Sequence, residues 1–477
     1  MLSAFCEPFP LTTPQKILAL CRENDVKTVD IRFVDLPGTW HSLSIPVSRL
    51  DEELFENGLG FDGKRFRGWN SGSESDRVAI PHPETAFIDP CGGRPTLSII
   101  ADIHDPVAGD NDVCDPRNVA WKTLNFLKTT SIADTACFGP EVEFYLFDGL
   151  LSAHREERLR HPREQSQGVV PPGVAGLSPI EDSLTQVHDS YATADSTPEM
   201  RHDLLQVMSA CGLSVECQQQ RLGAQHQMVT ALQGQDLVTM SDALMRYKHI
   251  VKSICCRHGQ TATFMPKPSR SLRGNGMRIQ LSLWKEDTAL FAGTEYAGRS
   301  DLALHAIGAI LKHAPALAAF TNPTTNSYAR LLPECEGPIN LDYSPHDAMS
   351  VCHIPSHSPI SQDQRIEFRC PDPSCNPYLA FSALLMAVID GIQNKIHPGD
   401  PADASLSHDT SAPRRETLPI SLADALTALQ EDHDFLLRGD VFSEHLLDSW
   451  IRMKREEEIE PLRRETHPYE VGRYFDV

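Results

Sequence analysis

The amino-acid sequence predicts a mixed α+β fold. Segments that alternate apolar and polar residues, as half-buried strands do, are interleaved loosely with segments of helical spacing. No internal repeat is apparent, and 477 residues are enough for two or more domains with a large core. The composition, 40% hydrophobic and 23% charged, is that of an ordinary globular protein.

The first part of the chain predicts a small sheet with one helix, then a second helix and a longer strand. The first helix has a threonine cap and Pro14 in its first turn. The glycine-rich residues 61–69 are typical of a loop at a binding site. Expected helices lie at 13–23 and 118–129, and expected strands at 29–34, 40–45, 96–102 and 138–148.

The second part alternates helices and strands in the same way. Helices are expected at 198–211, 242–258, 299–321 and 377–393, and strands at 213–217, 261–265 and 278–283. Two polar segments, 149–190 and 398–418, contain too few apolar residues to pack. We expect both to be poorly ordered surface regions.

Charge and cysteine usage restrict the class of protein. Lys+Arg number 43 against 65 Asp+Glu, giving a net charge of -22, so a nucleic-acid partner or an anionic membrane surface is disfavoured. The chain shows no leader-like start, and its longest apolar run, 378–389, is too short to span a bilayer. Thirteen cysteines without a C-x-x-C pair indicate reduced thiols, so we expect a cytoplasmic protein.

The segment FGPEVEFYLFD at 138–148 places Glu141 and Glu143 two residues apart in a strand. Their side chains should point to the same face. Two neighbouring carboxylates repel each other unless a positive charge lies between them. Either the face is solvated, or further residues converge on it to form a site.

Several motifs together resemble the bacterial type I glutamine synthetase family. They occur in family order over nearly the whole chain: FDG..GW at 61–69, FGPEVEF at 138–144, TATFMPKP at 261–268, NPTTNSYARL at 322–331, RIEFRCPDP at 365–373, NPYLAFSALLMAVIDGI at 376–392, NKIHPG at 394–399 and THPYE near the carboxyl end.

This resemblance implies a glutamine synthetase fold. A β-grasp domain would occupy residues 14–106, and a catalytic domain with a curved antiparallel sheet and helices would occupy 112–477. It also implies a homo-oligomer of hexameric rings, usually a dodecamer, with each active site between neighbouring subunits. In such enzymes ATP phosphorylates glutamate and ammonia displaces the phosphate, with Mg²⁺ or Mn²⁺ neutralising charge.

The resemblance also assigns roles to single residues. Catalytic roles fall to Asp62, Glu336 and Arg369, and substrate binding to Gly274, Arg330 and Arg369. Nucleotide contacts fall to Glu216, Ser282 and Arg365, and metal binding to Glu141, Glu143 and Glu367.

The chain departs from the family pattern at positions that carry chemistry. VECQQQRLGAQHQMV places Arg221, and then Met228 or Gln227, where metal-binding glutamates are expected. GMRIQLSL places Arg278 at a metal-ligand histidine and Gln280 at a nucleotide-side histidine. Other changes place His346, Ala348 and His353 at phosphate arginines, and Lys64, Arg65 and Arg67 beside the ammonium site. We expect the two histidines to be ordinary loop residues.

We therefore hypothesise that Arg221 and Arg278 replace the cations and pair with Glu141, Glu143 and Glu367. A carboxylate cluster built around divalent charge needs another counter-charge, because buried unpaired charge is costly. The alternative is that both arginines point to solvent or to another subunit while the acids keep one weak metal.

Two functions stay open. The first is a catalytically impaired homologue with a structural, ligand-binding or regulatory role in nitrogen metabolism, requiring no cofactor for catalysis. The second is an active ligase that uses ATP with Mg²⁺ or Mn²⁺ to join glutamate to ammonia or another amine. Glutamate, ATP or an amine would be the small-molecule ligand. Residues 398–418 contain no tyrosine, which argues against control by nucleotidylation of a tyrosine there.

Overall fold

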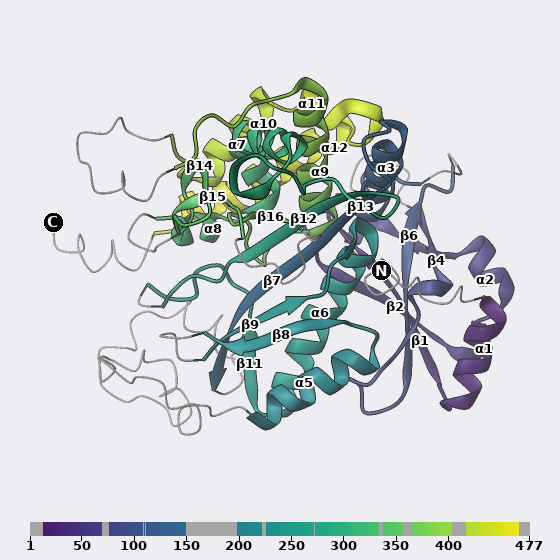
Figure 1. Ribbon diagram of the computed structural model, residues 1–477. Coiled ribbons are helices and arrows are strands. Elements are labelled where there is room, and N and C mark those ends of the chain that lie inside the picture. The colour runs from purple at the N-terminus through teal and green to yellow at the C-terminus, as the bar shows by residue number, and fades with distance from the viewer. Residues whose placement is uncertain are drawn as a thin grey trace.

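A computed structural model describes residues 13–68, 76–107, 109, 111–148, 198–221, 226–270, 272–332, 337–355, 364–402 and 416–466. It shows two sheets with helices packed around them (Figure 1). The expected polar segment 149–190 and residues 403–415 of the second one lie outside the described residues. The mixed α+β fold is confirmed.

The amino-terminal sheet has the strand order β2-β1-β6-β4-β3, with β5 also paired to β6. Strands β1 and β6 are parallel, and the other pairs are antiparallel. Helices α1 (Pro14–Glu23) and α2 (Glu52–Asn57) lie at its outer side (Figure 1). The strands are β1 (Thr28–Val34), β2 (Trp40–Pro46), β3 (Leu59–Asp62), β4 (Asp76–Pro81), β5 (Phe87–Asp89) and β6 (Thr96–His104).

Two local expectations here need correction. Asp62 does not lie in a loop but ends strand β3, whose register pairs Asp62 with Asp76 of β4. Thr13 precedes α1 but its side chain makes no capping hydrogen bond. Pro14 at the start of the helix removes one of the N–H groups that otherwise need a partner there.

The larger sheet is built around β7 (Thr135–Asp148), which pairs with β12 (Met277–Lys285) on one side and β9 (Gln227–Leu232) on the other. Its order is β14-β15-β16-β12-β7-β9-β8, and β14 and β15 form a parallel pair within an otherwise antiparallel sheet. The remaining strands are β8 (Val215–Gln220), β10 (Gln235–Asp236), β11 (Gln260–Thr263), β13 (Thr288–Ala289), β14 (Asn340–Ser344), β15 (Ser350–His353) and β16 (Ile366–Phe368).

Helices gather above and below this sheet in the view of Figure 1. Helix α6 begins five residues earlier than expected, because the Asp236 side chain accepts hydrogen bonds from Val238 and Thr239 and caps it there. The helices are α3 (Pro116–Thr129), α5 (Pro198–Ala210), α6 (Leu237–Arg257), α7 (Asp301–Thr321), α8 (Thr325–Arg330), α9 (Pro377–Asn394), α10 (Leu422–Glu431), α11 (Asp434–Leu437), α12 (Glu444–Lys454) and α13 (Glu460–Arg464).

Two glycines allow close packing of α7, one against the segment that follows α9 and the other against α9 itself. A Cβ on Gly308 would lie 2.2 Å from the carbonyl oxygen of Ile396, and one on Gly391 would lie 2.4 Å from the Cβ of Ala309. Among the described helices, α7 alone is long and apolar enough to cross a membrane. Because 72% of its apolar window is buried, it has the surroundings of a core helix.

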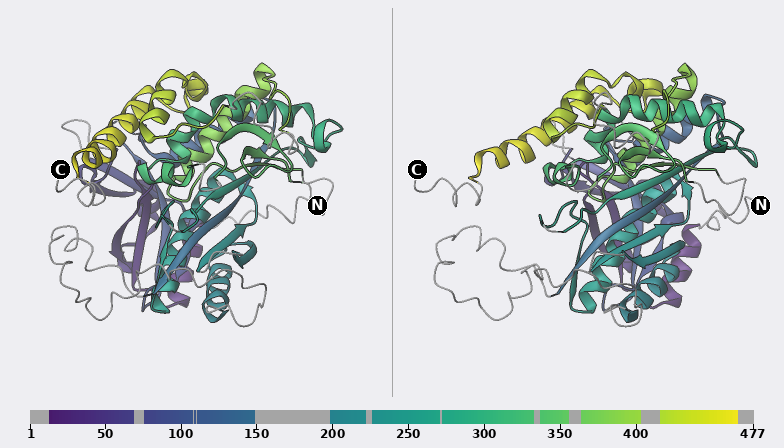
Figure 2. Two further views of the ribbon diagram at one scale, coloured as in Figure 1. Left: turned by 90° about the vertical axis from the view of Figure 1, so that its left-hand side faces the viewer. Right: turned by 60° about the vertical axis from the view of Figure 1, so that its left-hand side comes forward.

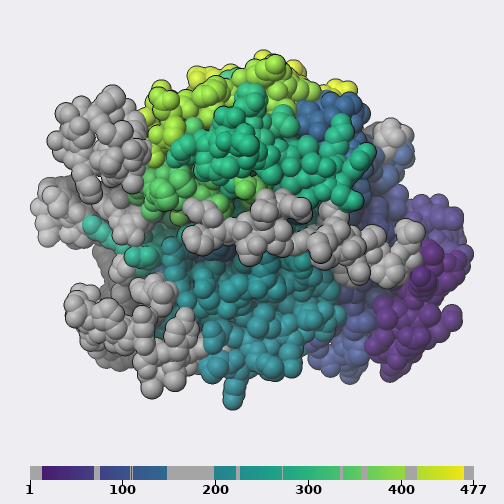
Figure 3. Space-filling view, in the orientation of Figure 1, coloured from purple at the N-terminus to yellow at the C-terminus, as the bar shows by residue number. Residues whose placement is uncertain are grey.

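The apolar side chains form two cores, one in the amino-terminal sheet and one around the larger sheet and its helices. A buried polar network joins the two parts. Arg117 of α3 donates to Asp102 of β6 (2.5 Å) and to Asp242 of α6 (3.0 Å), and Tyr378 of α9 donates to Asp242 (2.6 Å). The parts form one continuous body in the turned views (Figure 2), and α1 and α2 lie at its right-hand edge in the space-filling view (Figure 3).

Candidate active site

The centre of the candidate site is the middle of strand β7. Glu143 is 5% exposed, and its Oε2 accepts a hydrogen bond of 2.7 Å from the backbone N–H of Gly276. Glu141 precedes it by two residues, so both side chains emerge on the same face of the strand. Its side chain is 21% exposed. A buried carboxylate such as Glu143 needs a counter-charge.

Two arginines contact these carboxylates. Arg221 directly follows β8, and its guanidinium forms an ion pair with Glu143. Arg278 stands opposite Glu141 in the antiparallel register of β12 and β7, with 3.7 Å between Nη1 and Oε1. The two arginine side chains are 29% and 31% exposed, so both lie mostly within the protein. Whether they take the place of cations stays a prediction.

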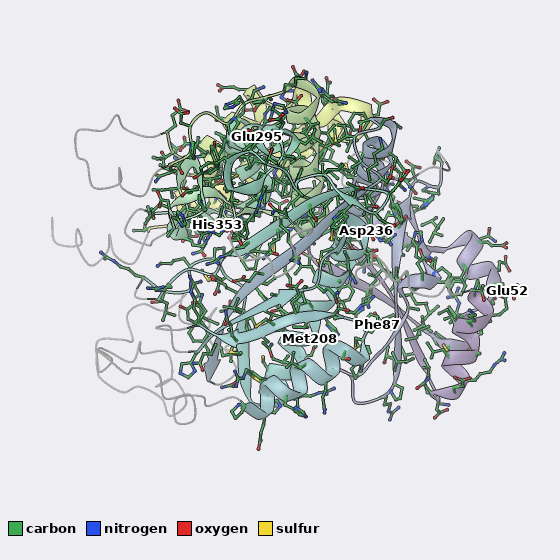
Figure 4. All side chains as sticks on the ribbon, viewed as in Figure 1. Glu52, Phe87, Met208, Asp236, Glu295 and His353 are labelled. Atoms are coloured by element: carbon green, nitrogen blue, oxygen red, sulfur yellow. The ribbon has the colours of Figure 1, made fainter. Side chains whose placement is uncertain are left out.

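A third carboxylate, Glu367, lies on β16 and is 5% exposed. Its Oε1 is 3.3 Å from Nε of Arg369 and 3.5 Å from Nδ1 of His353. His353, labelled in Figure 4, lies on β15 and is paired in register with Glu367. The expectation of an ordinary loop histidine is therefore wrong for His353. Its strand is short, and the sequence gives no signal for the partner strand.

Arg330 lies over the loop that begins at Gly274. It is 6% exposed and donates to backbone carbonyls after β16, including that of Pro371 (3.2 Å). A Cβ on Gly274 would lie 2.2 Å from Cγ of Arg330, so the close approach requires glycine. Fully buried Asn275 accepts a hydrogen bond from the side chain of Gln227 (3.0 Å). In the sequence this loop gives only a turn signal, so Asn275 was missed, and Gln227 was singled out only as a possible replacement for a metal-binding glutamate.

Burial and charge shift several pKa values in this cluster. Burial, followed by repulsion from Arg278, lowers the pKa of Arg221 to about 10 and also lowers the pKa of Arg369. Burial raises the pKa of Glu367, but His353 and the nearby arginines bring that pKa below its ordinary value. The site thus combines three carboxylates with arginines whose positive charges repel one another.

The residues expected to contact a nucleotide lie beside this cluster. Arg365 donates to the side-chain oxygen of Gln280 (2.5 Å) and lies 3.4 Å from a carboxylate oxygen of Glu216. It therefore connects β12 with β8. Ser282 is 3% exposed, and its hydroxyl accepts a hydrogen bond from Nε1 of Trp284 (3.0 Å).

One expected catalytic residue, Asp62, is not brought to the carboxylates, and another lies outside the described residues. Asp62 is exposed on β3, at the edge of the other sheet, and its side chain accepts from the backbone N–H of Lys64 (3.0 Å). Within the described residues no contact joins Asp62 to Glu141, Glu143 or Glu367. Glu336 lies outside the described residues.

The cluster does not fit two divalent cations in this arrangement. Mg²⁺ and Mn²⁺ need several converging oxygen ligands. Both carboxylate oxygens of Glu143 are engaged, one by Arg221 and one by the N–H of Gly276. In the part of the chain that the structure describes, Glu141, Glu143 and Glu367 do not bring three ligand atoms within 4.8 Å of one another.

The fold and the site define an α+β protein in which a small amino-terminal sheet precedes a larger one that carries carboxylates and arginines. The family model described as "Glutamine synthetase, beta-Grasp domain" matches residues 25–106, and "Glutamine synthetase, catalytic domain" matches 113–474. The chain belongs to the glutamine synthetase family, and the fold expected from the resemblance is confirmed.

Individual proteins are similar over almost the whole chain. Glutamine synthetases of Microchaete diplosiphon and Aquifex aeolicus are 41% and 42% identical to it, each match covering 98% of this chain and 100% of the relative. Among solved structures, Plasmodium falciparum glutamine synthetase superposes with a TM-score of 0.82 at 24% identity, covering 98% of this chain and 100% of that one. A structure titled "GmaS/ADP complex-Conformation 1" superposes with a TM-score of 0.80 at 26% identity, covering 96% of this chain and 99% of that one.

Proposed function

We propose that this chain is an ATP-dependent ligase that joins the γ-carboxyl group of glutamate to ammonia or another amine through γ-glutamyl phosphate. The observation that carries this proposal is the end-to-end similarity, at about 40% identity, to proteins named glutamine synthetase. The neighbour whose title names an ADP complex supports an adenine nucleotide as one ligand. These comparisons favour the ligase over the impaired homologue that the sequence hypothesis put first.

In this proposal each retained group acts on a charged part of a substrate. Arg330, held over Gly274, would orient the glutamate, and Arg365 would face the nucleotide. Arg221 and Arg278 would place fixed positive charge near the phosphate oxygens, where phosphoryl transfer needs charge to be neutralised. Mg²⁺ or Mn²⁺, when bound with ATP, supplies further positive charge to the phosphates.

A second function is favoured by one specific observation. Arg221 already neutralises Glu143, and Arg278 stands against Glu141. If these pairs persist when nucleotide binds, the carboxylates cannot hold cations, and the protein would bind ligands without turnover. Such a homologue would act as a binding or regulatory oligomer.

An assay of ADP and γ-glutamyl phosphate formation separates these functions. The protein is supplied with ATP, Mg²⁺ or Mn²⁺, glutamate, and either ammonium or a panel of primary amines. The ligase predicts glutamate-dependent turnover that falls at least tenfold in the variant Glu367→Gln. Absence of turnover with every amine, while ATP still binds in calorimetry, would refute the ligase and support the second function.

The assembly is also part of the proposal. We infer a cytoplasmic homo-oligomer of hexameric rings, with a dodecamer as the full assembly. Because Asp62 lies away from the carboxylates of its own chain, it would serve the site of a neighbouring subunit. Sedimentation velocity should give a mass of six or twelve copies of the 53.0 kDa chain, and a monomer at micromolar concentration would contradict this.

A further inference from the structure

A second group of ligand-type side chains lies where strand β5 meets helix α6. Asp89 ends β5, Cys91 follows two residues later, and His249 comes from the middle of α6. One ligand atom from each residue lies within 4.8 Å of the other two, and no other group of this kind occurs within the described residues. Phe87, the first residue of β5, marks this junction in Figure 4.

The local structure holds these three side chains in place. Oδ1 of Asp89 accepts a hydrogen bond of 2.8 Å from the backbone N–H of Cys91, which leaves Oδ2 2.8 Å from Nε2 of His249. Asp89 is 4% exposed. Arg257, also on α6, donates to the carbonyl of Pro90 and so ties the turn between the two ligands to the helix. Such outer contacts orient ligands before a metal binds.

We propose that Asp89, Cys91 and His249 bind one Zn²⁺ through Oδ2, Sγ and Nε2, with water as the fourth ligand. Carboxylate, thiolate and imidazole together form a donor set that suits Zn²⁺ and disfavours Mg²⁺. Tetrahedral bond lengths of about 2.0–2.3 Å place ligand atoms roughly 3.3–3.7 Å apart, so a shift of about 1 Å would close the site.

Binding of a divalent ion at this site is coupled to ionisation of the Cys91 thiol. Burial and the nearby Asp89 raise the pKa of the Cys91 thiol to about 12, so without metal the thiol keeps its proton. Binding of Zn²⁺ forms the Zn–S bond and releases that proton to solvent. Arg32 lies 3.5 Å from Oδ2 of Asp89 but is itself neutralised by Asp30 at 3.0 Å.

The bound ion would join the amino-terminal sheet to the helix that supports the larger sheet. This role does not depend on whether the candidate active site turns over. A ligand that binds the folded chain and not the unfolded chain raises the free energy of unfolding. Zn²⁺ should therefore raise the melting temperature of the whole protein.

The test uses the full chain after chelation and dialysis, titrated with Co²⁺ as a spectroscopic substitute for Zn²⁺. We expect one equivalent to bind with an absorption band from Co²⁺–thiolate charge transfer, and Zn²⁺ to displace it. Cys91→Ser should abolish the band and weaken Zn²⁺ binding at least tenfold, and His249→Gln should weaken binding by a similar factor. A carboxylate-only site elsewhere cannot produce this band.

The matched control is Cys256→Ser, which removes an exposed thiol from α6, the helix that carries His249. It should leave the band and the affinity unchanged. Circular dichroism and thermal melting of the metal-free variants establish that they are folded. A wild-type protein without the band, or a band that survives Cys91→Ser and disappears in Cys256→Ser, overturns the proposal.

Discussion

We predict that Arg221 limits metal binding by the carboxylates of β7. Its guanidinium pairs with Glu143, whose second oxygen is held by Gly276. Replacing Arg221 with Glu removes the competing cation and adds an oxygen ligand. We expect the affinity for Mn²⁺, measured by calorimetry, to rise at least tenfold in Arg221→Glu, equivalent to about 1.4 kcal/mol.

The matched control is Arg463→Glu, which makes the same change in charge at a side chain that is 80% exposed. It accounts for the general attraction of a more acidic protein for cations. Equal affinities in Arg221→Glu and Arg463→Glu would show that Arg221 does not compete with metal. Tight binding of two Mn²⁺ to the unchanged protein would reject the replacement hypothesis outright.

We predict that His82 makes the stability of the protein depend on pH. Burial lowers its pKa, but contacts with Asp102 (2.8 Å) and Glu84 (3.2 Å) outweigh burial and repulsion from Arg117 and raise the pKa to about 9. The protonated form is thus favoured by folding, so its contribution is complete below about pH 6.5 and is lost as pH rises through 9. Because 27% of the side chain is exposed to solvent, we expect protonated His82 to contribute about 2 kcal/mol to the free energy of unfolding.

Urea unfolding at a series of pH values measures this loss. In His82→Gln the free energy of unfolding should change less between pH 6.5 and 9 than in the unchanged protein. The exposed His445→Gln variant should keep the original dependence. An identical pH profile in His82→Gln would mean that another group is responsible.

At the scale of elements, the contact of α7 with α9 depends on the absence of side chains. Gly391→Ala would place a Cβ 2.4 Å from the Cβ of Ala309 and 2.4 Å from the carbonyl oxygen of His305. Alanine is otherwise about 1 kcal/mol better than glycine in a helix. Because overpacking outweighs this gain, we expect Gly391→Ala to lower the free energy of unfolding by about 1–3 kcal/mol.

Chemical denaturation of Gly391→Ala gives the sign of the change in the free energy of unfolding, and this sign distinguishes overpacking from helix propensity. Gly60→Ala on β3 is the comparison, since no heavy atom lies within 4 Å of its added Cβ. It should change stability by less than about 0.5 kcal/mol. Stabilisation by Gly391→Ala would mean that helix propensity, and not close packing, governs this position.

At the scale of the whole molecule, Arg117 links the two cores. It is 3% exposed and neutralises Asp102 in one sheet and Asp242 in the helix under the other. Arg117→Met would leave both carboxylates buried without that partner, at a cost of about 3–5 kcal/mol. We expect calorimetry to show an earlier transition for the amino-terminal sheet, separate from the larger core.

Lys128→Met, an exposed change on the same helix, is the corresponding control and should keep the original transition. If Arg117→Met also unfolds in one transition at an unchanged temperature, the apolar contacts between the parts, and not this network, couple them.

The sequence by itself determined the local structure and the family. Strand-like composition predicted β7 with its two glutamates, and apolar helical patterns predicted α7 and α9, because these signals depend on neighbouring residues alone. Motifs in family order indicated the glutamine synthetase fold. Gly274 was also found from its motif, although the reason for glycine there, the side chain of Arg330, was not visible.

The tertiary structure alone decided which charges meet. Arg221 and Glu143 are 78 positions apart, and Asp89 and His249 are 160 apart. Their contacts depend on strand register and on how α6 packs against the amino-terminal sheet, which no local pattern encodes. For the same reason the sequence left Cys91 as one of thirteen reduced thiols and His353 as a loop residue. Folding placed one beside Asp89 and the other beside Glu367.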